Sequence, residues 1–141
     1  MKNKLFLISL AILFAFTSCS EKENITGSWQ IESLKKDGVY QELLPVELTV
    51  TEQDNELLIS GTSTVNLFNG NVKLISENEI TCENIASTRM MGSPEAMELE
   101  TLFFDALSGK LKFTVKNDIL TLTDSEKQLE MTFKKAAEKS N

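Results

Sequence analysis

Few side chains in this 141-residue chain are suited to chemistry: two cysteines, one arginine, five methionines and 21 carboxylates. Histidine is absent, which removes the commonest general base near neutral pH and the commonest side chain for binding transition metals. A Ser–His or Cys–His catalytic pair is therefore impossible. The carboxylates do not assemble a general acid and base with a nucleophile. We expect a protein that is not an enzyme and that holds no cofactor and no metal.

Cys19 is the residue whose surroundings predict a definite reaction. Lys2 and Lys4 precede an apolar run over residues 5–16, and two small residues then lead directly to Cys19. A positive start, an apolar stretch and a small-residue cleavage point are typical of a secretory signal peptide. The run is shorter than the roughly 20 apolar residues of a transmembrane helix. With a cysteine at the cleavage point, the arrangement resembles a bacterial lipobox, in which the cysteine is lipidated.

The lipobox predicts how the protein is placed in the cell. Residues 1–18 form the signal peptide, and residues 19–26 form a polar, lipidated tether. The lipid on Cys19 makes a membrane the first expected partner. We expect anchoring to the outer membrane, on its periplasmic face or at the cell surface. The cell surface is an option because acidic residues soon after Cys19 resemble a lipoprotein surface-export signal.

The charge of the chain excludes one class of partner. The formal net charge of the whole sequence is −7, and removing the two lysines of the signal peptide makes the mature chain two units more negative. Such a surface repels phosphate backbones. We therefore expect no nucleic acid as a partner, and an unknown protein or small molecule instead.

Apolar residues alternate with polar ones through most of the mature chain, as in Val46, Leu48 and Val50. Alternation with a period of two predicts half-buried strands, about eight of them. Lys36-Asp37-Gly38 and Lys116-Asn117-Asp118 indicate turns, and Asn69-Gly70 predicts a two-residue hairpin turn.

One segment has helical spacing instead. Ser93-Pro94-Glu95 fits an N-cap, a proline at the first helical position and an early acid. Gly109 fits the position that ends a helix. An apolar stripe lies between them and consists of Ala96, Leu99, Leu102, Phe103, Ala106 and Leu107. We predict a mainly β (α+β) fold, an antiparallel open or cracked β-barrel of about eight strands with one amphipathic α-helix.

Several motifs in a fixed order support a family resemblance. They are Gly27-Ser28-Trp29-Gln30, the stretch from Ser60-Gly61 to Asn69-Gly70, Ser87-Thr88-Arg89-Met90, the helix from Pro94 to Gly109, and Leu120-Thr121-Leu122-Thr123. Together they resemble the META domain, or HslJ-like, family over residues 27–135, with residues 136–141 as a polar tail. The resemblance implies a cell-envelope or secreted protein linked to stress tolerance, with no established enzymatic activity. Family members often carry two cysteines near positions where this chain has residues 63–66 and 90–93, so chemistry of that pair is absent.

The loop Thr88, Arg89 and Met90 is the candidate contact for a ligand or partner. Arg89, the sole arginine, either ties the loop to nearby carbonyls or carboxylates or binds an anionic ligand. Glu100 is one carboxylate with which it could pair. Met90, Met91 and Met97 are also compatible with a copper(I) site, although methionine is a common core residue. Cys82 is expected to be a buried, inert thiol.

Two functions remain open. The first is a non-enzymatic cell-envelope lipoprotein whose META domain is a binding or interaction module linked to envelope stress tolerance. The second is a lipocalin-like carrier of a small hydrophobic ligand, because Gly27-Ser28-Trp29 matches the Gly-x-Trp opening of lipocalins. A barrel interior filled by large aromatic residues would argue against the carrier, and the candidates are Trp29, Phe68, Phe103, Phe113 and Phe133.

Overall fold

The computed structural model describes residues 24–137 and contains nine strands and one helix in that range. The signal peptide and Cys19 lie outside the described residues. The elements are β1 (Gly27–Lys36), β2 (Val39–Tyr40), β3 (Val46–Gln53), β4 (Glu56–Ser63), β5 (Asn66–Ser76), β6 (Glu79–Ser87), α1 (Pro94–Leu107), β7 (Lys110–Lys116), β8 (Ile119–Asp124) and β9 (Leu129–Lys135).

Eight of the strands form a closed antiparallel barrel, and β2 is an additional short strand on β1. Each strand pairs with the next around the ring, and β9 returns to pair with β1. The predicted antiparallel barrel with one helix is thus confirmed, and its ring is closed. The shortest seam lies between β6 and β7, which share only the pairs from Glu79↔Lys112 to Thr81↔Lys110.

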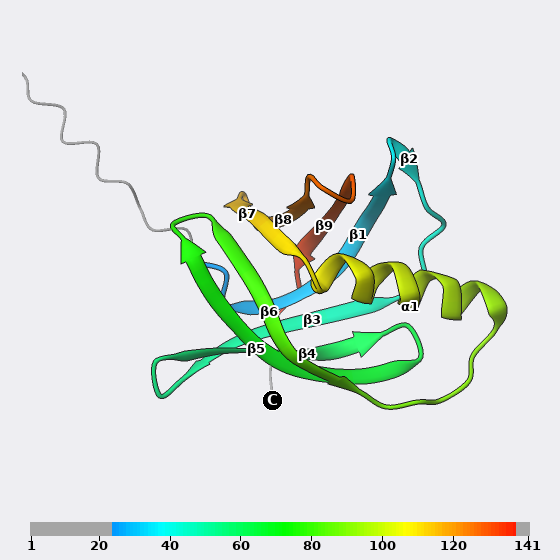
Figure 1. Cartoon of the computed structure of the whole chain (residues 1–141), viewed down its shortest axis with the longest axis horizontal. Coiled ribbons are helices and arrows are strands. Elements are labelled where there is room, and N and C mark those ends of the chain that lie inside the picture. Colours follow the sequence, from blue (N-terminus) through cyan, green and yellow to red (C-terminus); the bar gives the residue numbers. More distant parts are fainter. Residues whose placement is uncertain (1–23, 138–141) are drawn as a thin grey trace, which may run out of the picture.

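The two ends of the barrel differ in what they carry (Figure 1). The N-terminal end holds the first described residue and the turns at residues 54–55, 77–78 and 117–118. The helix end holds α1, the β6–α1 connection at residues 88–93 and the turns at residues 37–38 and 64–65. Because β6 runs from one end to the other, residues 88–93 and Asn24 lie at opposite ends of the molecule.

Large side chains fill the core. Trp29, Phe103, Phe113 and Phe133 are almost completely buried, as is Phe68, and all belong to one apolar cluster. Ile25 is also buried in this cluster, and its carbonyl accepts a hydrogen bond of 2.9 Å from Nε1 of Trp29. The folded body therefore begins two residues before the domain boundary that we placed at Gly27.

The predicted turn at Asn69-Gly70 is wrong, because both residues lie inside β5. The chain reverses earlier, at residues 64–65, where Thr64 has a φ of 74°. Gly70 serves a different purpose. A Cβ atom at Gly70 would lie 3.0 Å from the carbonyl oxygen of Glu83, where the β5–β6 register shifts. The glycine permits close approach of two strands at a bulge.

The predicted helix is confirmed. Ser93 is the N-cap, and its hydroxyl accepts a hydrogen bond of 3.2 Å from the backbone N–H of Ala96. The predicted stripe faces the core, with Leu99, Phe103 and Ala106 buried. The helix joins β6 to β7 and covers the helix end of the barrel beside their short seam (Figure 1).

Candidate binding site

A buried carboxylate organises the helix end. Glu100 lies on the inner face of α1, and only 6% of its surface is exposed. One oxygen accepts hydrogen bonds from the Ser63 hydroxyl (2.8 Å) and the Asn66 backbone N–H (3.1 Å). The other accepts a 2.7 Å bond from Nδ2 of Asn66. Glu100 thus joins the helix to both strands of the β4–β5 turn.

Asn66 also forms hydrogen bonds with the β6–α1 loop. Its side-chain oxygen accepts hydrogen bonds from the Thr88 hydroxyl (2.8 Å) and from the backbone N–H of Met90 (2.7 Å). The Thr88 hydroxyl in turn accepts a bond from the backbone N–H of Leu67 at 3.0 Å. No buried side-chain nitrogen or oxygen in residues 24–137 lacks a partner. A satisfied polar network of this kind fixes the loop backbone in one position.

The start of the helix adds two further constraints on the loop. The Thr64 hydroxyl donates a 3.2 Å hydrogen bond to the carbonyl of Ala96. Gly92 packs against Val65 so closely that a Cβ atom at position 92 would lie 2.4 Å from a Val65 methyl carbon. The sulfur of Met97 accepts a 3.4 Å bond from the N–H of Gly92. Both sides of the loop are therefore held.

The side chains at the tip of this loop face solvent. We call residues 88–91 the presenting loop. Arg89 is exposed and makes no hydrogen bond or ion pair within the described part of the chain. Met90 is 51% exposed and Met91 is 90% exposed. The suggested pairing of Arg89 with Glu100 is wrong, because Glu100 is occupied by Ser63 and Asn66. Arg89 does not tie the loop down.

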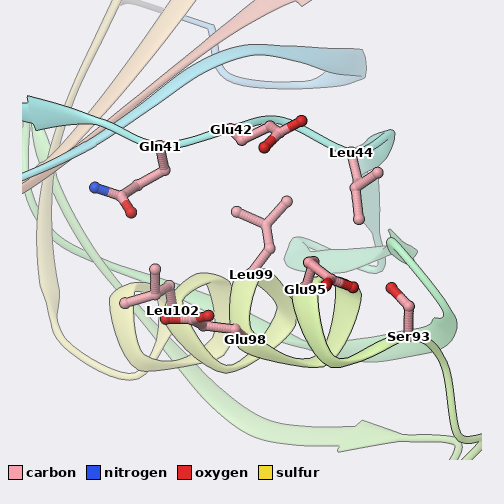
Figure 2. Close-up of a pocket in the computed structure, with 8 residues that line it drawn as sticks. All are labelled: Gln41, Glu42, Leu44, Ser93, Glu95, Glu98, Leu99 and Leu102. Carbon is pink, nitrogen blue, oxygen red and sulfur yellow. The ribbon is translucent and has the colours of Figure 1, made fainter.

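A cleft lies between α1 and the segment that connects β2 to β3 (Figure 2). Its volume is about 390 Å³. Leu99 rises from the helix toward this segment, and Leu44 points back at the helix (Figure 2). The lining residues are Gln41, Glu42, Leu44, Ser93, Glu95, Glu98, Leu99 and Leu102. Three carboxylates and no lysine or arginine line the cleft, so it repels anions and suits a cationic side chain with an apolar stem.

Glu95 carries its negative charge at the mouth of this cleft. Hydrogen bonds from its own backbone N–H and from the Ser93 hydroxyl lower the pKa of its carboxyl. The fully charged form also suits its place in the first turn of a helix, where the macrodipole favours an anion. Glu95 therefore keeps its charge across the neutral range.

The thiol of Cys82 lies away from this end, in the middle of β6. It is buried, and burial raises its pKa from 9.0 to about 12. A thiol is reactive as the thiolate, which burial in apolar surroundings disfavours. The structure thus agrees with the expected inert role of Cys82.

The methionines of the suggested copper(I) site differ in their surroundings. Met91 is nearly fully exposed, whereas the sulfur of Met97 is engaged by the Gly92 N–H. Within residues 24–137, no group of three or more Cys, Asp or Glu residues is placed to hold a metal ion. A helix long and apolar enough to cross a membrane is also not found in that range.

The Glu100–Asn66 connection is the part of the site that we did not predict. The sequence did contain one signal, because Glu100 falls between Leu99 and Phe103 on the apolar side of the helix. A carboxylate at such a position must find donors, since burying a charge without them is costly. Its partners come from residues 63–66 at the β4–β5 turn, whereas we predicted the turn at Asn69-Gly70.

The fold and the site define a small, closed antiparallel β-barrel whose helix end presents a rigid loop with exposed side chains. The sequence profile of the META domain matches residues 23–138, and the chain therefore belongs to the META domain family. No curated protein matches it. Two solved structures share the fold. An NMR structure of a protein from Burkholderia xenovorans has a TM-score of 0.66 and 19% identity, covering 79% of this chain and 82% of that one. A second NMR structure has a TM-score of 0.60 and 30% identity, covering 81% and 92%.

Proposed function

We propose that this protein is a non-enzymatic lipoprotein of the cell envelope whose META domain binds a partner protein through the presenting loop. The lipid on Cys19 anchors it to the outer membrane, and binding contributes to envelope stress tolerance. One observation carries the binding role: the exposed side chains of Arg89, Met90 and Met91 project from a backbone that the buried Glu100–Asn66 network holds.

The energetics of the loop support binding. Leaving two methionines largely in water forgoes the stabilisation that their burial would supply, which is about 1.5–3 kcal/mol for a fully buried side chain. A rigid backbone keeps the entropy lost on association small, because the loop is already ordered. A loop whose backbone is held in place while its apolar side chains are exposed is better suited to contact with a partner than to a purely structural role.

The exposed side chains of the presenting loop also indicate what kind of partner surface they suit. A guanidinium without a partner of its own pairs with a carboxylate in two parallel hydrogen bonds. Methionines adapt to irregular apolar surfaces. We therefore expect the partner to offer an acidic residue beside an apolar pocket, and to be a protein rather than a nucleic acid.

The filled interior argues against the carrier alternative. All five aromatic residues that would block a lipocalin-like cavity are buried in the core, namely Trp29, Phe68, Phe103, Phe113 and Phe133. A pocket for a drug-sized ligand is about 300–1,000 Å³, and here this central volume is occupied by side chains. A fluorescent fatty acid should show no saturable binding.

Site-specific cross-linking in intact cells tests the binding surface. A photo-cross-linking amino acid replaces Met91 in one variant and Lys112, an exposed residue on β7, in the control. The expected result is an adduct from position 91 that is absent from position 112. Adding Arg89→Ala should weaken the adduct, whereas Lys116→Ala should not. Equal adducts from both positions, or none from position 91, would contradict the proposal.

The anchor is tested separately by the intact mass of the native protein. We expect cleavage after Ser18 and acyl groups on Cys19, with the protein in the membrane fraction. Cys19→Ser should leave the uncleaved precursor. A native protein with a free thiol at position 19 would rule out the lipoprotein part and leave the cross-linking result standing.

A further inference from the structure

The β5–β6 hairpin extends beyond its pairing with β4 at the N-terminal end of the barrel. Pairing between β4 and β5 stops at Leu57↔Val72, but β5 continues to Ser76. Residues along β5 alternate between buried and exposed as far as Val72, and the four that follow are all exposed. Leu74 and Ile75 are among them, with 40% and 46% of their surfaces in water. Two adjacent apolar side chains therefore sit on a projecting hairpin.

The chain enters the barrel beside this hairpin. Asn24, the first described residue, lines a depression of about 410 Å³ together with Leu74 and Glu77. Leu57 and Phe113 form its apolar side. Figure 1 shows the blue start of the described chain next to the tip of β5. The apolar hairpin and the point of attachment thus share one end of the molecule.

The length of the tether limits how far this end can be from the lipid. Only residues 20–23 separate Cys19 from Asn24. A fully extended chain spans at most about 3.6 Å per residue, so Cys19 lies within about 18 Å of Asn24. A lipid anchor on Cys19 therefore holds the N-terminal end of the barrel close to the bilayer surface.

We infer that Leu74 and Ile75 contact the surface of the bilayer that holds the Cys19 lipid, so that the barrel stands with its helix end pointing away. This inference rests on the proposed lipidation of Cys19. Two half-exposed side chains bind a membrane weakly by themselves. The tether makes their contact intramolecular, at an effective concentration in the millimolar range, and the contact then sets the orientation of the body.

The charges around the hairpin indicate which lipids it suits. Glu52 and Glu77 line the same depression as Leu74, and no lysine or arginine does. Lys73 is the nearest cation along β5, and it is exposed. Carboxylates near an anionic headgroup layer are repelled. The contact should therefore form on zwitterionic lipids and weaken on a bilayer rich in phosphatidylglycerol.

Fluorescence quenching in reconstituted vesicles tests the contact. The mature lipidated protein is placed in vesicles of phosphatidylethanolamine and phosphatidylcholine with brominated acyl chains. The test variant is Ile75→Trp. The matched control is Leu67→Trp, an even more exposed position (58% against 46% for Ile75) near the other end of the same strand. The wild type, whose single tryptophan is buried, supplies the background.

We expect bromine to remove about half of the emission added by Ile75→Trp, since interfacial side chains lie about 5–10 Å deep. The emission added by Leu67→Trp should not change. Vesicles rich in phosphatidylglycerol should reduce the quenching at position 75. Urea unfolding of both variants checks that the barrel is intact.

Several results would overturn the inference. Equal quenching at positions 67 and 75 would mean that the body has no fixed orientation. Emission from position 75 that shifts to the blue without quenching would mean that protein, such as a second copy, covers the hairpin. Vesicles that retain the protein with no quenching at position 75 would remove the contact and leave the lipoprotein proposal intact. Protein that carries no acyl group and does not float with vesicles would remove both.

Discussion

Glu100 determines the position of the presenting loop, although it touches none of the loop's exposed side chains. Its two oxygens take the Ser63 hydroxyl and two N–H groups of Asn66, and Asn66 then holds Thr88 and Met90. The carboxylate is therefore a positioning group, two hydrogen bonds away from the surface that we propose binds the partner.

Replacing Glu100 by alanine should be strongly destabilising. The change removes the acceptor of the Asn66 backbone N–H and of one Asn66 side-chain N–H, whereas the Ser63 hydroxyl keeps the Asn66 carbonyl at 3.1 Å. Each unsatisfied buried group costs about 1–3 kcal/mol. We expect the free energy of unfolding to fall by about 3 kcal/mol or more, measured by urea titration. Glu98→Ala, at an exposed position on the same helix, is the control and should change stability by less than about 0.5 kcal/mol. Similar losses from both variants would contradict the role of the network.

Arg89→Ala should separate stability from binding. The guanidinium is exposed and has no partner in residues 24–137. We therefore expect the melting temperature to stay within error of the wild type, while the cross-linked adduct from position 91 weakens. A clear fall in melting temperature would instead show that Arg89 stabilises the folded protein.

The raised pKa of the Cys82 thiol should make the free energy of unfolding depend on pH in the alkaline range. Its pKa rises from 9.0 to about 12 in the folded state because of burial. Below pH 9 the thiol is protonated in both states, so its contribution to stability is fully present. As the pH rises from 9 toward 12, the unfolded thiol ionises first, and stability is lost at up to about 1.4 kcal/mol per pH unit.

The measurement is the free energy of unfolding of the wild type and of Cys82→Ala between pH 8 and pH 10.5. The wild type should lose stability more steeply above pH 9. Parallel curves would show that the Cys82 thiol ionises as easily in the folded protein as in the unfolded chain.

At the residue scale, the loop could be predicted from sequence, whereas its exposed methionines and its support could not. Methionine is a common core residue, yet the structure exposes Met90 and Met91 together with Arg89. Glu100 accepts a hydrogen bond from Asn66, which lies 34 positions away in the sequence. No local pattern predicts such a pair, because it depends on which strand faces the helix.

Among the elements, β3 and β4 depend on a single glycine for their close approach. A Cβ atom at Gly61 would lie 1.9 Å from the carbonyl oxygen of Glu47. Gly61 also has a φ of 158°, a backbone conformation that residues with a side chain rarely adopt, so strain adds to the lack of space. The strands could accept a side chain there only by moving apart.

Gly61→Ala should therefore cost about 2–4 kcal/mol of unfolding free energy, as overpacking against rigid backbone does. Gly38→Ala is the control: position 38 has open space but a φ of 81°, which costs an alanine about 1–2 kcal/mol. Calorimetry of both variants shows which of them loses more stability. A loss at position 38 larger than at position 61 would contradict the steric account.

An element could be predicted where the residues that determine it lie close together in the sequence. The helix was predictable because its cap, proline and apolar stripe lie within 16 residues. The hairpin turn was misplaced because Asn69-Gly70 is a typical turn pair, whereas Gly70 is needed for its contacts with Glu83, Ile85 and Ile59 on neighbouring strands. A contact across strands outweighed the local preference.

For the molecule as a whole, the start of the folded body can be tested by truncation. A chain that begins at Asn24 keeps the buried Ile25 and the acceptor for Trp29. It should unfold at the same urea concentration as the longer mature protein. A chain that begins at Gly27 loses both, and we expect its stability to fall by about 3 kcal/mol. Equal stability of the two truncated chains would place Ile25 outside the core.

Closure of the ring was not predictable from the alternating pattern, which indicates strands without saying which ones meet. It depends on β9 returning to β1, where the hydroxyls of Ser33 and Thr132 lie 2.6 Å apart across 99 positions. Contacts so distant in sequence slow folding, because a long loop must close before they form. β9 is the last strand in sequence within residues 24–137, and it is also the strand that completes the barrel. Before β9 is in place, β1 and β8 each keep an unpaired edge, so the ring stays open until the end of this range has been synthesised.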